Sequence, residues 1–271
     1  LSPVPHIAGV TTTLSTVLSA TSGAGGNTVL GYNLDRFVSY YANAPYTFDS
    51  KYTVSGSICS DASNFITKIS SLRWEPLWSV GALWNIKKEK WIGEIGWLDR
   101  LTLRATYGRN GNVEKSSSTN TLLNVANTLN ANTGTITATI ADNGNPTLRW
   151  EKTSTTNIGS DFSLFGKKLE GRIEAYSKKG TDITGVVALA AATGTTSQRF
   201  NNAQISNKGI EIELGTQVPL PFENLTYSTK VNYAFNKNEV KSLYYPSILA
   251  SNMLDPGNTY VEGKPINPVY S

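Results

Sequence analysis

Apolar and polar residues alternate along much of this chain, and a period of two places successive side chains on opposite faces of a β-strand. Within positions 51–58, Tyr52, Val54 and Ile58 fall on one face, opposite the polar residues Thr53 and Ser57. The same alternation recurs further along the chain. It predicts about eight strands, at roughly residues 29–41, 51–59, 74–86, 101–109, 149–164, 168–178, 206–218 and 225–238.

Aromatic residues stand at or near the ends of several of these apolar faces. Amphipathic rings favour the headgroup level of a bilayer, so girdles of aromatic residues border the lipid-facing band of membrane β-barrels. The candidates for such a lipid interface are Tyr52, Trp78, Trp84, Tyr107, Tyr227, Tyr233 and Phe235. A soluble β-sandwich also alternates, so this pattern alone leaves barrel and sandwich open.

Short and long connections take turns between the predicted strands. Residues 165–168 and 219–224 are short connections, whereas 60–73, 108–149 and 178–206 are long. Outer-membrane barrels keep short turns on the periplasmic side and long loops outside, so these lengths favour a barrel. We therefore expect residues 1–28 to be a loop or irregular segment, 29–240 to be transmembrane barrel strands with long extracellular loops, and 241–271 to begin a further extracellular loop.

The composition agrees with a hollow structure. Hydrophobic residues make up 39% and charged residues 16%, and that charged fraction is below the roughly 25% of soluble domains. No apolar segment approaches the roughly 20 residues that a transmembrane helix needs, so membrane residence would come from strands. The net charge of +4 forms no basic block, so no nucleic-acid partner is expected. Cys59 is the only cysteine, which excludes an internal disulfide.

Several blocks of the sequence resemble the SusC/RagA-type TonB-dependent outer-membrane transporters. Residues 97–112 (WLDRLTLRATYGRNGN) are close to the family's LdxLKLRaSYGxxGN signature, and residues 145–161 (NPTLRWEKTSTTNIGSD) resemble its NPnLkWEkxxqxNiGlDf block. Further similar stretches, in the family's order, are 48–57 (FDSKYTVSGS) with 61–65 (DASNF), 74–86 (WEPLWSVGALWNI), 207–213 (NKGIEIE) and 262–266 (EGKPI). Residues 58–61 (ICSD) depart from the family, which usually carries an arginine there.

The resemblance implies an all-β fold, namely a segment of a larger transmembrane antiparallel barrel of about 22 strands with a plugged lumen. About eight strands cannot close such a barrel, and open strand edges in lipid would leave backbone groups unpaired, so we expect part of a longer chain. The resemblance further implies an outer-membrane location, a SusD-like surface lipoprotein, TonB acting through regions outside this sequence, contact with membrane lipid, and import of oligosaccharide or peptide nutrients.

Charged residues on the polar faces of the strands are expected to line the barrel lumen, since water tolerates them and lipid does not. These are Arg104, Asp161, Glu170, Arg172, Glu174, Glu211, Glu213 and Lys230. The sequence suggests no enzyme, because His6 is the only histidine and no motif for a catalytic, cofactor-binding or metal-binding site surrounds it. Two alternatives remain open: a SusC-like barrel that serves as a structural component of an envelope complex, and a soluble β-sandwich adhesin.

Overall fold

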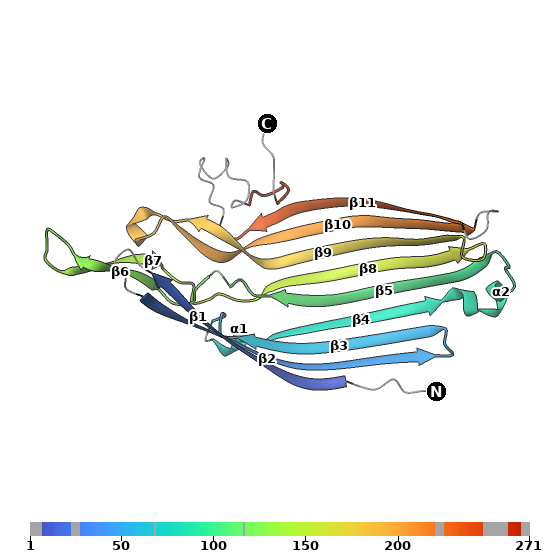
Figure 1. The fold of residues 1–271 in the computed structure, drawn as a ribbon, viewed down its shortest axis with the longest axis horizontal. Helices are drawn as coiled ribbons and strands as arrows, with labels where there is room; N and C mark the ends of the chain where they lie inside the picture. Colours follow the sequence, from blue (N-terminus) through green and yellow to red (C-terminus); the bar gives the residue numbers. More distant parts are fainter. Residues whose placement is uncertain are drawn as a thin grey trace.

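One antiparallel sheet of nine strands, in the order β1-β2-β3-β4-β5-β8-β9-β10-β11, makes up most of the structure, which is a computed structural model (Figure 1). Strands β6 and β7 form a separate two-stranded sheet. The structure describes residues 7–22, 28–67, 69–115, 117–219, 225–245 and 260–266. The antiparallel sheet confirms the predicted all-β fold class.

The strands of the main sheet are β1 (Ile7–Ser22), β2 (Thr28–Phe48), β3 (Tyr52–Ser63), β4 (Glu75–Asn85), β5 (Leu98–Asn112), β8 (Glu151–Leu164), β9 (Leu169–Ala188), β10 (Ser197–Pro219) and β11 (Thr226–Leu243). The hairpin consists of β6 (Leu122–Leu129) and β7 (Ile136–Asp142), and the short helices are α1 (Ser70–Arg73), α2 (Lys90–Gly93), η1 (Ile86–Lys88) and η2 (Ala191–Thr193). Among the described residues, no helix is long and apolar enough to cross a membrane.

The first strand corrects the expectation of a loop or irregular segment over residues 1–28. That expectation is wrong for Ile7–Ser22, which form β1 and pair along their whole length with β2. The segment is rich in Thr and also contains Ile and Val, and such β-branched residues favour strands even where the overall composition is polar. A polar composition had therefore concealed a strand.

Two of the predicted long loops also contain strands. The β6–β7 hairpin lies inside the connection expected over residues 108–149, and it projects from the main sheet at the end where α1 lies (Figure 1). In the connection expected over residues 178–206, β9 continues to Ala188 and β10 begins at Ser197. Only residues 189–196 join them, so these two strands are much longer than their apolar segments.

The sheet has a polar face and an apolar face, and it has little core between layers. The pairing register aligns Trp84, Leu103, Ile173, Ile212 and Tyr233 in one row across six strands, with only Ser160 interrupting the apolar set. Large side chains of this row, such as Tyr233, are exposed. The alternation predicted from the sequence is therefore real, but it does not bury the apolar face within the described chain.

Two small packed regions close the ends of the sheet. At the end with the short turns, Ile86, Ile92 and Leu98 are buried together where η1 and α2 fold back. At the opposite end, Leu148 and Trp150, the last apolar residues of the long connection between β5 and β8, are buried. The Trp150 indole Nε1 donates a hydrogen bond of 2.7 Å to the Arg73 carbonyl oxygen, which ties that connection to α1.

Candidate functional site on the polar face of the sheet

The predicted charged residues lie on neighbouring strands of the polar face. One pairing row runs from Arg104 through Gly159 and Glu174 to Glu211, and the adjacent row on this face joins Asp161, Arg172 and Glu213. Glu170 and Lys230 share the next row with Gly215 between them. The structure thus brings all eight predicted residues into one surface cluster, which we call the charged ladder.

Arg104 is central to the charged ladder because it reaches two acidic residues. Its guanidinium forms an ion pair with Glu174 on β9 and lies 3.3 Å from Asp161 on β8. To reach Glu174, the side chain passes over Gly159, where an added Cβ would come within 2.8 Å of Arg104 Nε. The glycine therefore provides the space that this two-strand contact needs.

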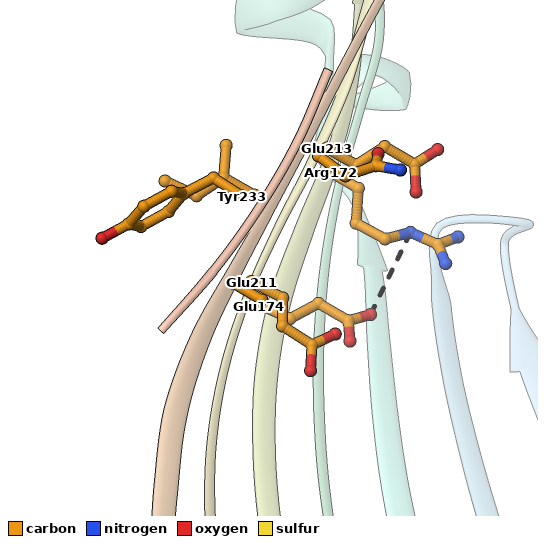
Figure 2. Close-up of a pocket in the computed structure, with 8 residues that line it drawn as sticks. Arg172, Glu174, Glu211, Glu213 and Tyr233 are labelled. Carbon is orange, nitrogen blue, oxygen red and sulfur yellow. Dashed lines mark ion pairs between the residues drawn. The ribbon is translucent and has the colours of Figure 1, made fainter. Parts of the chain in front are cut away.

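Arg172 continues the network from the neighbouring position. Its Nε donates a hydrogen bond of 2.7 Å to Asp161 Oδ1. The same nitrogen lies 4.0 Å from Glu174 Oε1, the ion pair that Figure 2 marks with a dashed line. Asp161 and Glu174 are therefore each shared between two arginines, an arrangement that fixes long side chains with more than one contact. Figure 2 shows Arg172 and Glu174 on one side of the sheet and the Tyr233 ring on the other.

The remaining members of the charged ladder leave an excess of negative charge. Lys230 Nζ lies 2.5 Å from Glu213 Oε1, whereas Glu170 and Glu211 have no ion pair among the described residues. Two shallow hollows of about 330 and 290 Å³ lie side by side over this region and share Arg172 and Glu213 in their linings. Such a surface holds water and offers hydrogen bonds and negative charge to whatever occupies the space above it.

The predicted aromatic residues lie on the opposite, apolar face. The rings of Tyr52 and Trp84 stack with centroids 6.3 Å apart, and those of Trp78 and Tyr107 meet edge to face at 5.3 Å. Tyr227, Tyr233 and Phe235 follow one another on that face of β11, and all three are more than half exposed. A run of uncovered rings on a pleated face is what the apolar belt of a membrane barrel requires.

Glu89 anchors two of these aromatic residues from the connection after β4. Its Oε1 accepts a 2.5 Å hydrogen bond from the Tyr52 hydroxyl and a 3.1 Å hydrogen bond from the Trp84 indole. These donors, Tyr52 foremost, hold the pKa of the Glu89 carboxyl below its ordinary value, because they stabilise the charged form. The acidic side chain thus fixes the polar edges of both rings.

Sequence reasoning missed a second charge cluster at the loop end of the strands. The Glu75 carboxylate, which is 8% exposed, lies 3.0 Å from Lys152 Nζ and 3.5 Å from Arg109 Nη2. Nearby, Arg149 Nη2 donates a 2.6 Å hydrogen bond to Asp182 Oδ1. The block at residues 145–161 contains Arg149 and Lys152, and their charge next to the buried Trp150 was the available signal.

Buried amides secure the same region, and the sequence gave no indication of them. Asn201 Oδ1 accepts a hydrogen bond of 3.0 Å from the Arg149 amide, and Asn201 Nδ2 donates to the carbonyl oxygens of Arg149 and Asp182 at 2.8 Å each. Asn202 binds the backbone of Tyr245 in a similar way. These side chains lie in β10 but bond to backbone groups in β9 and in the connections near Arg149 and Tyr245, so alternation along one strand could not reveal them.

A two-faced antiparallel sheet of long strands, with tight turns such as residues 165–168 at one end and the long β5–β8 connection at the other, is typical of a segment of an outer-membrane β-barrel. A family model, TonB dependent receptor-like β-barrel, matches residues 9–269, and the chain belongs to this family. The family consists of outer-membrane β-barrel proteins, in agreement with the predicted location, and of transporters, not enzymes.

The relatives include receptors of two organisms. A TonB-dependent receptor of Formosa agariphila is 30% identical over 206 residues, which cover 76% of this chain and 19% of the relative. The TonB-dependent receptor SusC of Bacteroides thetaiotaomicron is 27% identical over 212 residues, or 76% of this chain and 21% of SusC. The chain thus spans about one fifth of the length of these relatives, and the predicted SusC/RagA-type resemblance is confirmed.

Solved structures show the same fold. The RagAB peptide importer in its closed-closed state superposes with a TM-score of 0.77 at 24% identity, covering 88% of this chain and 26% of that one. The copper transporter OprC superposes less closely, with a TM-score of 0.52 at 12% identity, covering 86% of this chain and 35% of that one. At these identities the likeness concerns the fold alone.

Proposed function

We propose that this chain forms part of the wall of a SusC/RagA-type nutrient transporter, with the charged ladder facing the lumen and the aromatic face in contact with lipid. The separation of the two faces carries this proposal. Arg172 and Glu213 stand beside each other on one face, while Ile173 and Ile212 stand beside each other on the opposite face. Lipid does not tolerate the first pair at its midplane, and a water-filled or plug-filled lumen does.

The edges of the sheet support the same arrangement. Within the described residues, β1 pairs only with β2, and β11 pairs only with β10. An unpaired strand edge in hydrocarbon leaves backbone groups without partners, which costs several kcal/mol for each group. Further strands therefore have to continue the wall on both sides, and residues 29–240 then supply transmembrane strands of that larger barrel.

The cargo and partners of the whole transporter follow from the family resemblance. Resemblance to the SusC/RagA type implies uptake of glycan or peptide fragments and a SusD-like lipoprotein on the outer side of the membrane. It also implies that TonB supplies energy from the inner side. Two relatives fit this class: SusC by sequence, and the RagAB peptide importer by fold. The loop end of the sheet, with the charge cluster around Glu75 and the β6–β7 hairpin, is where a lid and a nutrient would meet this chain.

Uptake by the complete transporter tests this function. Cells that carry the complete chain and its lipoprotein are given fluorescent oligosaccharides or peptides, with and without a protonophore that removes the energy for TonB. Energy-dependent uptake of one class supports the proposal and identifies the cargo class. An intact barrel that takes up neither supports the structural role in an envelope complex, and extraction without detergent would indicate the soluble adhesin.

A further inference from the structure

Tyr40 and Trp74 mark one end of the apolar face. Their rings stack with centroids 5.7 Å apart, and both are exposed. Phe48 lies at the other end of the same face of β2. Tyr40 and Phe48 are separated by eight residues, or about 26 Å of strand, which is about 20 Å of height at the usual tilt of a barrel strand. The apolar band of a membrane barrel is about 25 Å high. In the proposed orientation, Tyr40 and Trp74 therefore stand close to the boundary between this band and the outer lipid headgroups.

A pocket lies directly beyond this aromatic pair. It has a volume of about 380 Å³, and its lining includes the Arg36, Arg73 and Trp74 side chains together with Asn64 and Asn120. Arg36 precedes Tyr40 by four residues on β2, so it points to the same face two repeats further from the apolar band. The pocket thus opens on the lipid side of the sheet, away from the charged ladder.

The two arginines of this pocket are not neutralised. Among the described residues, no carboxylate forms an ion pair with Arg36 or Arg73. Arg73 Nε donates a hydrogen bond of 3.2 Å to the Thr67 carbonyl oxygen, which holds the side chain in place, and the structure gives its terminal nitrogens no carboxylate partner. Elsewhere at this end of the sheet, Arg109 and Arg149 form ion pairs with Glu75 and Asp182. The unpaired cations of this pocket therefore offer a site for an anion.

Position and chemistry together select the ligand. A nutrient in the lumen cannot reach this face, whereas the headgroup of a neighbouring lipid lies against it. Guanidinium groups bind phosphate with two parallel hydrogen bonds, and the adjacent aromatic pair provides an amphipathic surface at the polar boundary of the bilayer. We propose that the Arg36–Arg73 pocket binds the phosphate group of a lipid in the outer leaflet. This inference rests on the proposed assignment of lipid and lumen faces.

The test measures lipid retained by the complete transporter. The protein is embedded in phosphatidylcholine nanodiscs that contain lipid A with or without its phosphate groups, then extracted and weighed by native mass spectrometry. Wild type should retain phosphorylated lipid A. The Arg36→Gln and Arg73→Gln variants should each bind it roughly tenfold more weakly, as expected for the loss of one charged hydrogen bond. Inorganic phosphate in excess should not displace the lipid.

A matched control separates a built site from general attraction between charges. Lys237 lies on the apolar side of β11, next to the end of its aromatic run, and it is not among the residues that line the pocket. Lys237→Gln should leave retention unchanged. Equal loss in Lys237→Gln and Arg36→Gln, equal retention of dephosphorylated lipid A, or displacement by inorganic phosphate would each overturn the proposal. The face assignment is tested separately by the cysteine pair below, so its failure is distinguishable.

Discussion

Arg104 on β5 crosses the intervening strand β8 to pair with Glu174 on β9, and it does so over Gly159, which has no side chain. Both charged side chains are less than a quarter exposed. An ion pair with this degree of shielding contributes more than an exposed one, since water screens it less. Gly159 therefore permits a contact that helps to fix the register of β5, β8 and β9.

Replacing Gly159 with valine should break this link. The new Cβ would lie 2.8 Å from the present position of Arg104 Nε and would displace the guanidinium. We expect the free energy of unfolding in detergent to fall by about 1–2 kcal/mol. Arg104→Ala added to this variant should cost little more, because the contact is already lost. Denaturant titration of the complete transporter measures both.

The control for that substitution is Gly56→Ala. An added Cβ at Gly56 meets no atom within 4 Å, so the change should be near neutral or slightly stabilising. If Gly56→Ala and Gly159→Val lowered stability equally, the loss would come from backbone effects and not from the Arg104–Glu174 contact.

The orientation of the sheet can be tested with two adjacent residues. Asn232 lies on the face of the charged ladder and Tyr233 on the apolar face. In a Cys59→Ser background, Asn232→Cys should react with a water-soluble maleimide in membranes, whereas Tyr233→Cys should be protected by lipid. Reaction rates that are equal, or that have the reverse order, would contradict the lipid and lumen assignment.

Acid should weaken the attachment of the Tyr52 and Trp84 rings to the connection after β4. Hydrogen bonds, first from Tyr52, lower the pKa of Glu89 in the folded protein from its ordinary value of 4.5. A lowered folded pKa gives stability that is present above 4.5 and lost as the pH falls through the folded pKa. The stability difference between wild type and Glu89→Gln should therefore be constant near neutral pH and shrink in acid.

Tyr52→Phe gives an independent check of the same contact. It removes the donor hydroxyl and keeps the ring, so the acid-dependent part of the difference should become smaller. A difference between wild type and Glu89→Gln that grows on acidification would show that Glu89 has a raised pKa and that the proposed hydrogen bonds are absent.

The loop end should loosen when Asn201 is replaced by alanine. The substitution leaves the Arg149 amide and two backbone carbonyl oxygens without their partner, and an unsatisfied buried group costs about 1–3 kcal/mol. Protease cleavage between residues 113 and 147 should then be about tenfold faster, since cleavage follows local opening. As a control, Asn124→Ala at an exposed position of β6 should be cleaved at the same rate as wild type.

Strand alternation made much of the fold predictable because each strand of the wall has one apolar face. Tyr52, Val54 and Ile58 define such a face without reference to any other strand. The strand Ile7–Ser22 was not predicted because threonine is both a polar residue and a good strand former. The register of this strand is set by its pairing with β2. Composition alone cannot separate a polar strand from a loop.

The charged ladder was predictable as a set of residues but not as a network. Sequence alternation placed Arg104 and Glu174 on polar faces. Their contact also depends on the pairing register of β5, β8 and β9, which places Gly159 between them. The clamps of Asn201 and Asn202 were not predictable for a related reason. Asn201 bonds Arg149 and Asn202 bonds Tyr245, each more than forty residues away in the sequence, and only the tertiary fold brings these partners close.

The length of β10 determines where the mouth of the barrel stands. On the face that carries Ile210 and Ile212, apolar side chains give way to Lys208 and Ser206, but the strand begins at Ser197. The polar part spans roughly 40 Å of strand, or about 30 Å of height at the usual tilt of a barrel strand. In the proposed orientation, the upper wall therefore extends as a collar above the bilayer. A lid protein would then rest on this collar, and lipid thickness would not set the height at which the opening is sealed.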